Sequence, residues 1–125
     1  MDSSRLRQKV LHLDEERRRL VGQVLRPLPM IVGSLYQIRR SCGNTRCKCA
    51  RGQLHVSWYL SRRTGGRTKL IYIGRVVPEW LATRAHRYQR FQKTLAAIRK
   101  IDAAISAALN QLRDAKLKTF DKARQ

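Results

Sequence analysis

Three cysteines and a histidine lie between residues 42 and 55, and this cluster constrains the fold more than any other feature of the sequence. The segment reads SCGNTRCKCARGQLH, and its ligand candidates are separated by four, one and five residues: Cys42, Cys47, Cys49 and His55. Gly43, Asn44 and Gly52 tolerate the turns needed to aim several side chains at one point. A closed tetrahedral zinc site requires four ligands. We therefore predict a structural Zn²⁺ ion held by these four residues.

Two other interpretations of the cluster stay open at this point. The three thiols could be free beside a surface histidine, or Cys47 and Cys49 could form a redox pair, although a disulfide across one residue is strained. The spacing also differs from that of common zinc fingers. A catalytic zinc ion needs an open position and a nearby base, and no carboxylate lies near the cluster in sequence. The predicted site is therefore structural.

Charge is the second strong feature. Lys and Arg number 28 against 8 Asp and Glu, which gives a net charge of +20. No acidic residue lies between Glu16 and Glu79. Like charges without partners oppose compaction, so this stretch predicts a polyanionic partner. The predicted nucleic-acid contacts are Arg39, Arg40, Arg46, Lys48, Arg51, Arg62, Arg63, Arg67, Lys69 and the aromatic Tyr59.

Apolar periodicity predicts two helices. The first covers residues 4–25, with Ser3 or Ser4 as its N-cap, and it ends before Pro27. The second begins at Pro78 and Glu79 and continues to about residue 118. Its predicted heptad seam consists of Leu81, Arg84, Tyr88, Phe91, Leu95, Ile98, Asp102, Ile105, Leu109 and Leu112.

The segment between the helices is rich in β-formers. Residues 30–40 favour one strand, and the runs 55–63 and 67–74 favour a hairpin with a glycine turn. We predict an α+β fold in which a long antiparallel, coiled-coil-like helical hairpin is capped by a small zinc-stabilised β-hairpin head. The predicted parts are an N-terminal helix with its proline connector (1–29), a basic zinc-knuckle head (30–77), a long amphipathic helix (78–118) and a basic tail (119–125).

Two features of the helices predict contacts. Arg17 and Asp102 interrupt the apolar seams, and we expect such polar residues to fix register or pairing, including with each other. The second helix is longer than the first, so an apolar strip over residues 98–112 should need another partner. We expect a homodimer, or a larger protein, to cover it.

The cluster and its surroundings resemble a bacterial protein family of unknown function. The shared knuckle residues here are Cys42, Gly43, Cys47, Cys49, Ala50, Gly52 and His55. The similarity covers residues 30–105 and includes Gly33 and Ser34, an Arg-rich hairpin, and a helix with Tyr88 and Phe91 near its start. Members often have a proline soon after the histidine, whereas Val56 follows here. The resemblance implies a zinc-type knuckle and an association with bacterial mobile elements, and it supplies no established activity.

These patterns predict a non-enzymatic nucleic-acid-binding protein. We expect weakly selective or nonselective binding of duplex DNA, as an accessory factor of a mobile element or recombination complex. The alternative is an RNA-binding or ribosome-associated basic zinc protein. In that case the aromatic residues interleaved with the arginines would stack on unpaired bases: Trp58, Tyr59, Tyr36 and Tyr72. Alternation favours Trp58 as a core residue and Tyr59 as the stacking residue.

Enzyme and membrane classes are less consistent with the sequence. A metal-dependent nuclease would need clustered carboxylates, whereas Asp14, Glu15 and Glu16 are consecutive and point to different faces of a helix. Tyr36 beside Arg39 is a conceivable nucleophile, but tyrosines in a β-rich head are mostly packing residues. No apolar run approaches the ~20 residues of a membrane span. We therefore expect a cytoplasmic protein of the bacterial nucleoid.

Overall fold

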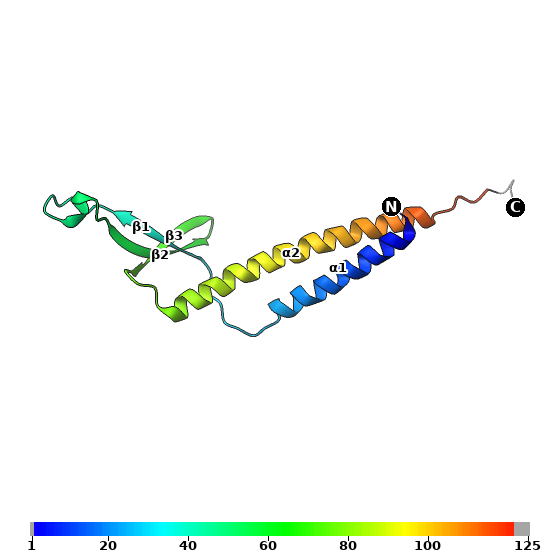
Figure 1. Ribbon diagram of the computed structural model, residues 1–125, viewed down its shortest axis with the longest axis horizontal. Helices are drawn as coiled ribbons and strands as arrows, with labels where there is room; N and C mark the ends of the chain where they lie inside the picture. Colours follow the sequence, from blue (N-terminus) through cyan, green and yellow to red (C-terminus); the bar gives the residue numbers. More distant parts are fainter. Residues whose placement is uncertain (1, 122–125) are drawn as a thin grey trace. The chain divides into compact units, whose positions relative to one another are not determined.

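The computed structural model describes residues 2–121 (Figure 1). Its elements are α1 (Ser3–Val24), β1 (Ser34–Arg40), the 3-10 helix η1 (Lys48–Arg51), β2 (His55–Thr64), β3 (Arg67–Gly74) and α2 (Glu79–Lys116). The predicted α+β class is confirmed at this level. Residues 122–125 of the predicted tail lie outside the described residues. Among the described helices, none combines the length and the apolar character needed to cross a bilayer.

The chain divides into two compact units. The helical unit consists of Met1–Arg26 and Lys93–Gln125, and the sheet unit consists of Pro27–Gln92. The predicted parts follow the bounds of the helices and strands, whereas the division between the units falls within α2 itself. Each unit has its own buried residues.

An aspartate starts α1. The carboxylate of Asp2 accepts a hydrogen bond from the backbone N–H of Arg5 at 2.9 Å, so Asp2 is the N-cap. The prediction that Ser3 or Ser4 is the N-cap is wrong. A carboxylate can satisfy the same free N–H group as a serine hydroxyl, and its charge also suits the positive end of the helix dipole.

The core of the helical unit is built around Leu20, Ile98 and Ile101. Leu13, Val21, Val24, Ala97 and Ile105 pack against these three side chains. Burial of a leucine or isoleucine side chain contributes about 1.5–3 kcal/mol, so this contact stabilises the unit. The prediction that residues 98–112 lack a partner within the chain is wrong for Ile98 and Ile101, which are 8 % exposed.

The seam of α2 differs in part from the predicted one. Thr94, Ile98, Ile101 and Ala108 are buried and keep heptad spacing, whereas Leu109, which was assigned to the seam, is 47 % exposed. The same shift occurs in the sheet unit, where Ala85 is buried and Arg84 is exposed. A rule that weights large apolar residues misses positions where small side chains fit best.

The predicted pairing of Arg17 and Asp102 is confirmed. The Nε atom of Arg17 donates to Oδ1 of Asp102 at 2.6 Å, and the two side chains are 41 % and 48 % exposed. The pair therefore lies at the edge of the core, where water screens it partly.

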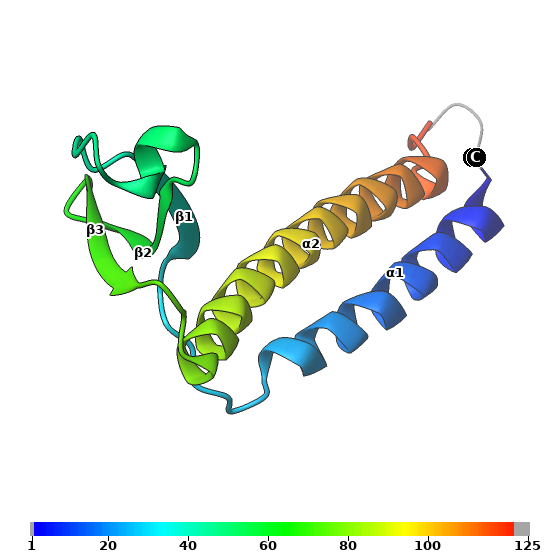
Figure 2. The same ribbon diagram turned by 60° about the vertical axis from the view of Figure 1, so that its left-hand side comes forward.

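The sheet unit contains an antiparallel sheet in the order β1-β2-β3 (Figure 2). The hairpin between β2 and β3 turns at Gly65 and Gly66, whose φ angles of 60° and 79° suit a two-residue hairpin turn. Because Cα partners share a face, the strands divide into two faces. We call the one with Leu35, Leu60 and Ile71 the leucine face, and the one with Tyr36, Tyr59 and Tyr72 the tyrosine face.

The segment before β1 joins the sheet to the beginning of α2. Gly33 has a φ of 129°, and a Cβ atom there would lie 2.7 Å from the carbonyl oxygen of Ser61. Only glycine permits this close approach to the backbone of β2. The side-chain amide of Gln89 donates to the carbonyl oxygen of Gly33 at 2.6 Å. The backbone N–H of Ile31 donates to the carbonyl oxygen of Arg84 at 3.1 Å.

Candidate metal centre and nucleic-acid interface

The four predicted metal ligands all belong to the connection from β1 to β2 or to the first residue of β2. Asn44 shapes the beginning of this connection: its side-chain oxygen accepts from the N–H of Arg46, and its carbonyl oxygen from the N–H of Cys47, both at 3.0 Å. Helix η1 follows, and its C-cap is Gly52, whose φ of 98° favours glycine. These two turns bring Cys47 and Cys49 back toward Cys42.

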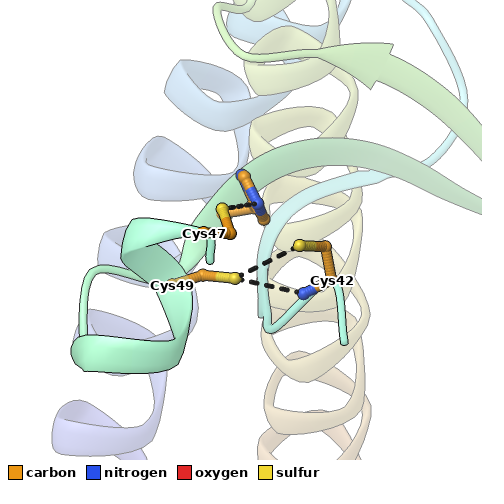
Figure 3. A group of neighbouring side chains, drawn as sticks. Cys42, Cys47 and Cys49 are labelled. Atoms are coloured by element: carbon orange, nitrogen blue, oxygen red, sulfur yellow. Dashed lines mark hydrogen bonds between the residues drawn. The ribbon is translucent and has the colours of Figure 1, made fainter. Parts of the chain in front are cut away.

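The ligand atoms of Cys42, Cys47, Cys49 and His55 all lie within 4.8 Å of one another. The sulfurs of Cys42 and Cys49 are 3.4 Å apart, and the sulfur of Cys47 lies 3.2 Å from Nε2 of His55. Figure 3 shows the three cysteine side chains directed toward one another. Zn–S bonds of about 2.3 Å and a Zn–N bond of about 2.0 Å in a tetrahedron would place the ligand atoms roughly 3.6–3.8 Å apart. The three cysteines are free of disulfides. The cluster could therefore hold a metal ion with small shifts of its side chains.

Cys49 is the most enclosed ligand and the one that the backbone prepares for ionisation. It is 3 % exposed, and its sulfur accepts from the N–H of Cys42 at 3.3 Å. This hydrogen bond is the main reason why the pKa of Cys49 falls to about 6, and the side chains of Cys42 and Ser41 add to the effect. Without metal, Cys49 is thus a thiolate at neutral pH.

The neighbouring thiol behaves in the opposite way. The backbone N–H of Asn44 lowers the pKa of Cys42, but the hydrogen bond with Cys49 and desolvation outweigh it, and the pKa of Cys42 is raised above its ordinary value. Cys42 thus stays protonated in the metal-free state, and its S–H group donates a hydrogen bond to the Cys49 thiolate.

The nine predicted basic contacts form two groups at opposite ends of β2. The knuckle cluster lies at the His55 end, and it consists of Arg39, Arg40, Arg46, Lys48 and Arg51. The hairpin cluster lies at the Thr64 end, and it consists of Arg62, Arg63, Arg67 and Lys69. The 10 residues of β2 separate these ends by about 30 Å.

Exposure and strand register refine this picture. Eight of the nine side chains are exposed, whereas Arg62 is half-buried and its Nε atom is buried without a hydrogen-bond partner. Arg40 and Arg63 belong to the tyrosine face, and Arg39 belongs to the leucine face. Phosphate contacts from both clusters would therefore involve both faces of the sheet.

Tyr59 is the centre of a row of three tyrosines. Its ring is stacked on that of Tyr36 at a centroid distance of 6.3 Å, and it meets the ring of Tyr72 edge-to-face at 5.6 Å. All three tyrosines were stacking candidates from the sequence, and Tyr59 was the one favoured as a contact. The signal for the row was present, because Tyr59 and Tyr72 are equally distant from the Gly65 and Gly66 turn and must pair in a two-residue hairpin.

A family model described as a domain of unknown function, DUF6788, matches residues 11–83. This match covers more than half of the chain. The chain belongs to this family. The matched range includes the four ligand candidates and all three strands. The description of the family gives no ligand or activity, so the metal and the mobile-element association remain predictions. Comparisons with curated proteins and with solved structures found no match.

Proposed function

We propose that this chain is a nucleic-acid-binding protein and that a structural zinc ion holds its binding surface in shape. One observation carries the proposal: the sheet unit has a single acidic residue, Glu79, among its 66 positions. Its thirteen basic residues are Arg39, Arg40, Arg46, Lys48, Arg51, Arg62, Arg63, Arg67, Lys69, Arg75, Arg84, Arg87 and Arg90. A surface of one sign on this scale favours a polyanion, and the planar guanidinium of arginine matches the geometry of phosphate oxygens.

The donor set supports zinc as the metal. Three thiolates and one imidazole form a common structural zinc site, and soft thiolate ligands select against magnesium or calcium. Three thiolates leave a net charge of −1 around a divalent ion, which nearby Arg46, Lys48 and Arg51 offset. Zinc bound there would tie the end of β1 to the beginning of β2, and so would fix the knuckle cluster relative to the sheet.

The spacing of the two basic clusters supports duplex DNA as a ligand. Each strand of a duplex places one phosphate per about 3.4 Å of helix axis, so a separation of about 30 Å along the axis corresponds to roughly nine phosphates of one strand. Arginine and lysine contacts to phosphate, which are the contacts proposed for both clusters, carry no sequence information. We therefore propose weakly selective or nonselective binding. RNA binding is the second candidate, because the row of tyrosines offers rings for unpaired bases.

We propose an accessory rather than a catalytic role in a mobile-element or recombination complex. Among the described carboxylates, Asp14, Glu16 and Asp102 each form an ion pair with an arginine, so these three do not make an acidic metal centre. The helical unit also exposes Leu11 and Leu109 at 69 % and 47 %, which suits contact with a second copy or a larger protein. The zinc-stabilised head would then supply the nucleic-acid contact.

The experiment is a salt titration of binding to a fluorescent duplex, combined with metal analysis of the purified protein. If all nine predicted basic residues contact phosphate, the slope of log K against log salt should be about −8, and affinity should fall ~10³- to 10⁵-fold between about 50 and 200 mM salt. A flat salt response would refute phosphate binding. Competition by single-stranded RNA then separates the two candidate ligands.

A further inference from the structure

We infer that the tyrosine face is a stacking platform for unpaired bases, so that the chain grips single-stranded nucleic acid as well as duplex phosphates. This inference rests on the proposed function and adds the part of the ligand that the arginines do not recognise. Its ligand is an unpaired strand, and the chemistry is the stacking of a base on an exposed tyrosine ring.

The two faces of the sheet differ in burial. On the leucine face, Leu60 is 5 % exposed and lies beneath the backbone of Gly33. On the tyrosine face, no residue of the three strands is buried, and Leu70 and Tyr72 are 47 % and 62 % exposed. Cross-strand aromatic pairs that serve only packing gain most from a covered face. The described residues leave this face open at Leu70 and Tyr72, whereas Tyr36 and Tyr59 are half-buried.

Charge complementarity decides what kind of partner fits the open face. Strand register places Arg40 and Arg63 on the tyrosine face, four residues beyond Tyr36 and Tyr59 respectively. Each is thus about 13 Å along its strand from the tyrosine row, and the two lie toward opposite ends of the sheet. A row of rings between two arginines suits a chain with a flat apolar group and an anion in every unit, which is the chemistry of a single nucleic-acid strand. An acidic protein would satisfy the arginines but not the rings.

The geometry of the rings allows stacking without disruption of the sheet. Tyr72 meets Tyr59 with an interplanar angle of 71°, so its own faces are not stacked on that ring. With 62 % of the residue exposed, a base can approach it directly. Substitution of Tyr72 should therefore reduce the stacking of bases most and disturb folding least.

The test compares binding of the metal-loaded protein to a labelled thymidylate strand of about 16 nucleotides and to a labelled duplex of the same length, by fluorescence anisotropy. Tyr72→Leu should weaken binding of the single strand about 5- to 150-fold, which corresponds to about 1–3 kcal/mol for one stacked base. Its duplex affinity should change less than about twofold. Tyr72→Phe keeps the ring and should bind like wild type.

The matched control is Tyr88→Leu, because Tyr88 belongs to α2, outside the three strands, and its hydroxyl accepts from the side-chain amide of Gln92. It should leave both affinities unchanged. Equal weakening of strand and duplex by Tyr72→Leu, or no weakening of either, would overturn the stacking role while duplex binding stands. Failure of the wild type to bind either probe at low salt would overturn the proposed function itself. A uridylate strand in parallel shows whether RNA or DNA is the preferred source of unpaired bases.

Discussion

Replacement of Cys49 by serine should destabilise the sheet unit by an amount that the structure allows us to estimate. An ion bound to Cys42 and His55 cross-links the ends of a 14-residue segment. Closing a loop of about 15 residues by a covalent cross-link stabilises a protein by about 3 kcal/mol at 25 °C. A serine hydroxyl does not replace the thiolate as a zinc ligand at neutral pH, so the Cys49→Ser site should lose its ion and, with it, the cross-link between Cys42 and His55. Cys49→Ser should therefore lower the free energy of unfolding by about 3 kcal/mol.

Urea denaturation followed by tryptophan fluorescence measures this change, since Trp58 and Trp80, the two tryptophans of the chain, both lie in the sheet unit. With slopes of about 1–3 kcal/mol per molar urea, the midpoint should fall by about 1–3 M. A chelator should bring the wild type to the same midpoint. Ser41→Ala keeps all four ligands and removes only the 3.7 Å contact to Cys49, so it should change stability by less than about 0.5 kcal/mol. If removal of the metal leaves the midpoint unchanged, the cross-link argument is wrong.

Three further predictions concern the ion pair, the hairpin and the thiols. A double-mutant cycle with Arg17→Met and Asp102→Leu should give a coupling of about 0.5–1 kcal/mol, because the pair is partly exposed; additive single effects would contradict this. Replacing all four residues of the hairpin cluster by glutamine should reduce the slope of log K against log salt by about 4. The control is Arg18→Gln with Arg19→Gln on α1, which should leave the slope unchanged because these arginines pair with Asp14 and Glu16. Equal effects of the two sets of substitutions would argue against a localised binding surface. In metal-free protein, ultraviolet absorbance should show a thiolate forming near pH 6 that Cys49→Ser abolishes. Because folding lowers the pKa of Cys49 from 9.0 to about 6, the thiolate stabilises the folded state above pH 9, and this stabilisation is lost as the pH falls through about 6. A first thiol titration near pH 9 would contradict the lowered pKa.

The sequence predicted those parts of the fold that depend on local chemistry. Alternation in residues 55–74, together with Gly65 and Gly66, was sufficient for the hairpin and for the opposite faces of Trp58 and Tyr59. Polar interruptions in two apolar seams were sufficient for the pairing of Arg17 with Asp102. The Cys/His cluster that could hold a metal ion was found because cysteine and histidine are rare and were close in sequence.

The parts that sequence reasoning missed depend on contacts between distant segments. Burial of Ala85 and Ala108 follows from how closely neighbouring elements approach, which hydrophobicity along one helix does not contain. The distance between the two basic clusters follows from the length of β2 and from the return of the chain at the knuckle. The low pKa of Cys49 follows from the N–H of Cys42, a backbone group that no side-chain pattern reveals.

The most direct test is the dissociation constant of the zinc-loaded protein for a labelled duplex at about 50 mM salt, measured beside the same protein after removal of the metal. We predict saturable binding by the zinc-loaded protein and weaker binding by the metal-free protein, since the knuckle cluster loses its fixed position. If the zinc-loaded protein binds neither DNA nor RNA under these conditions, the basic sheet unit is not a nucleic-acid-binding surface.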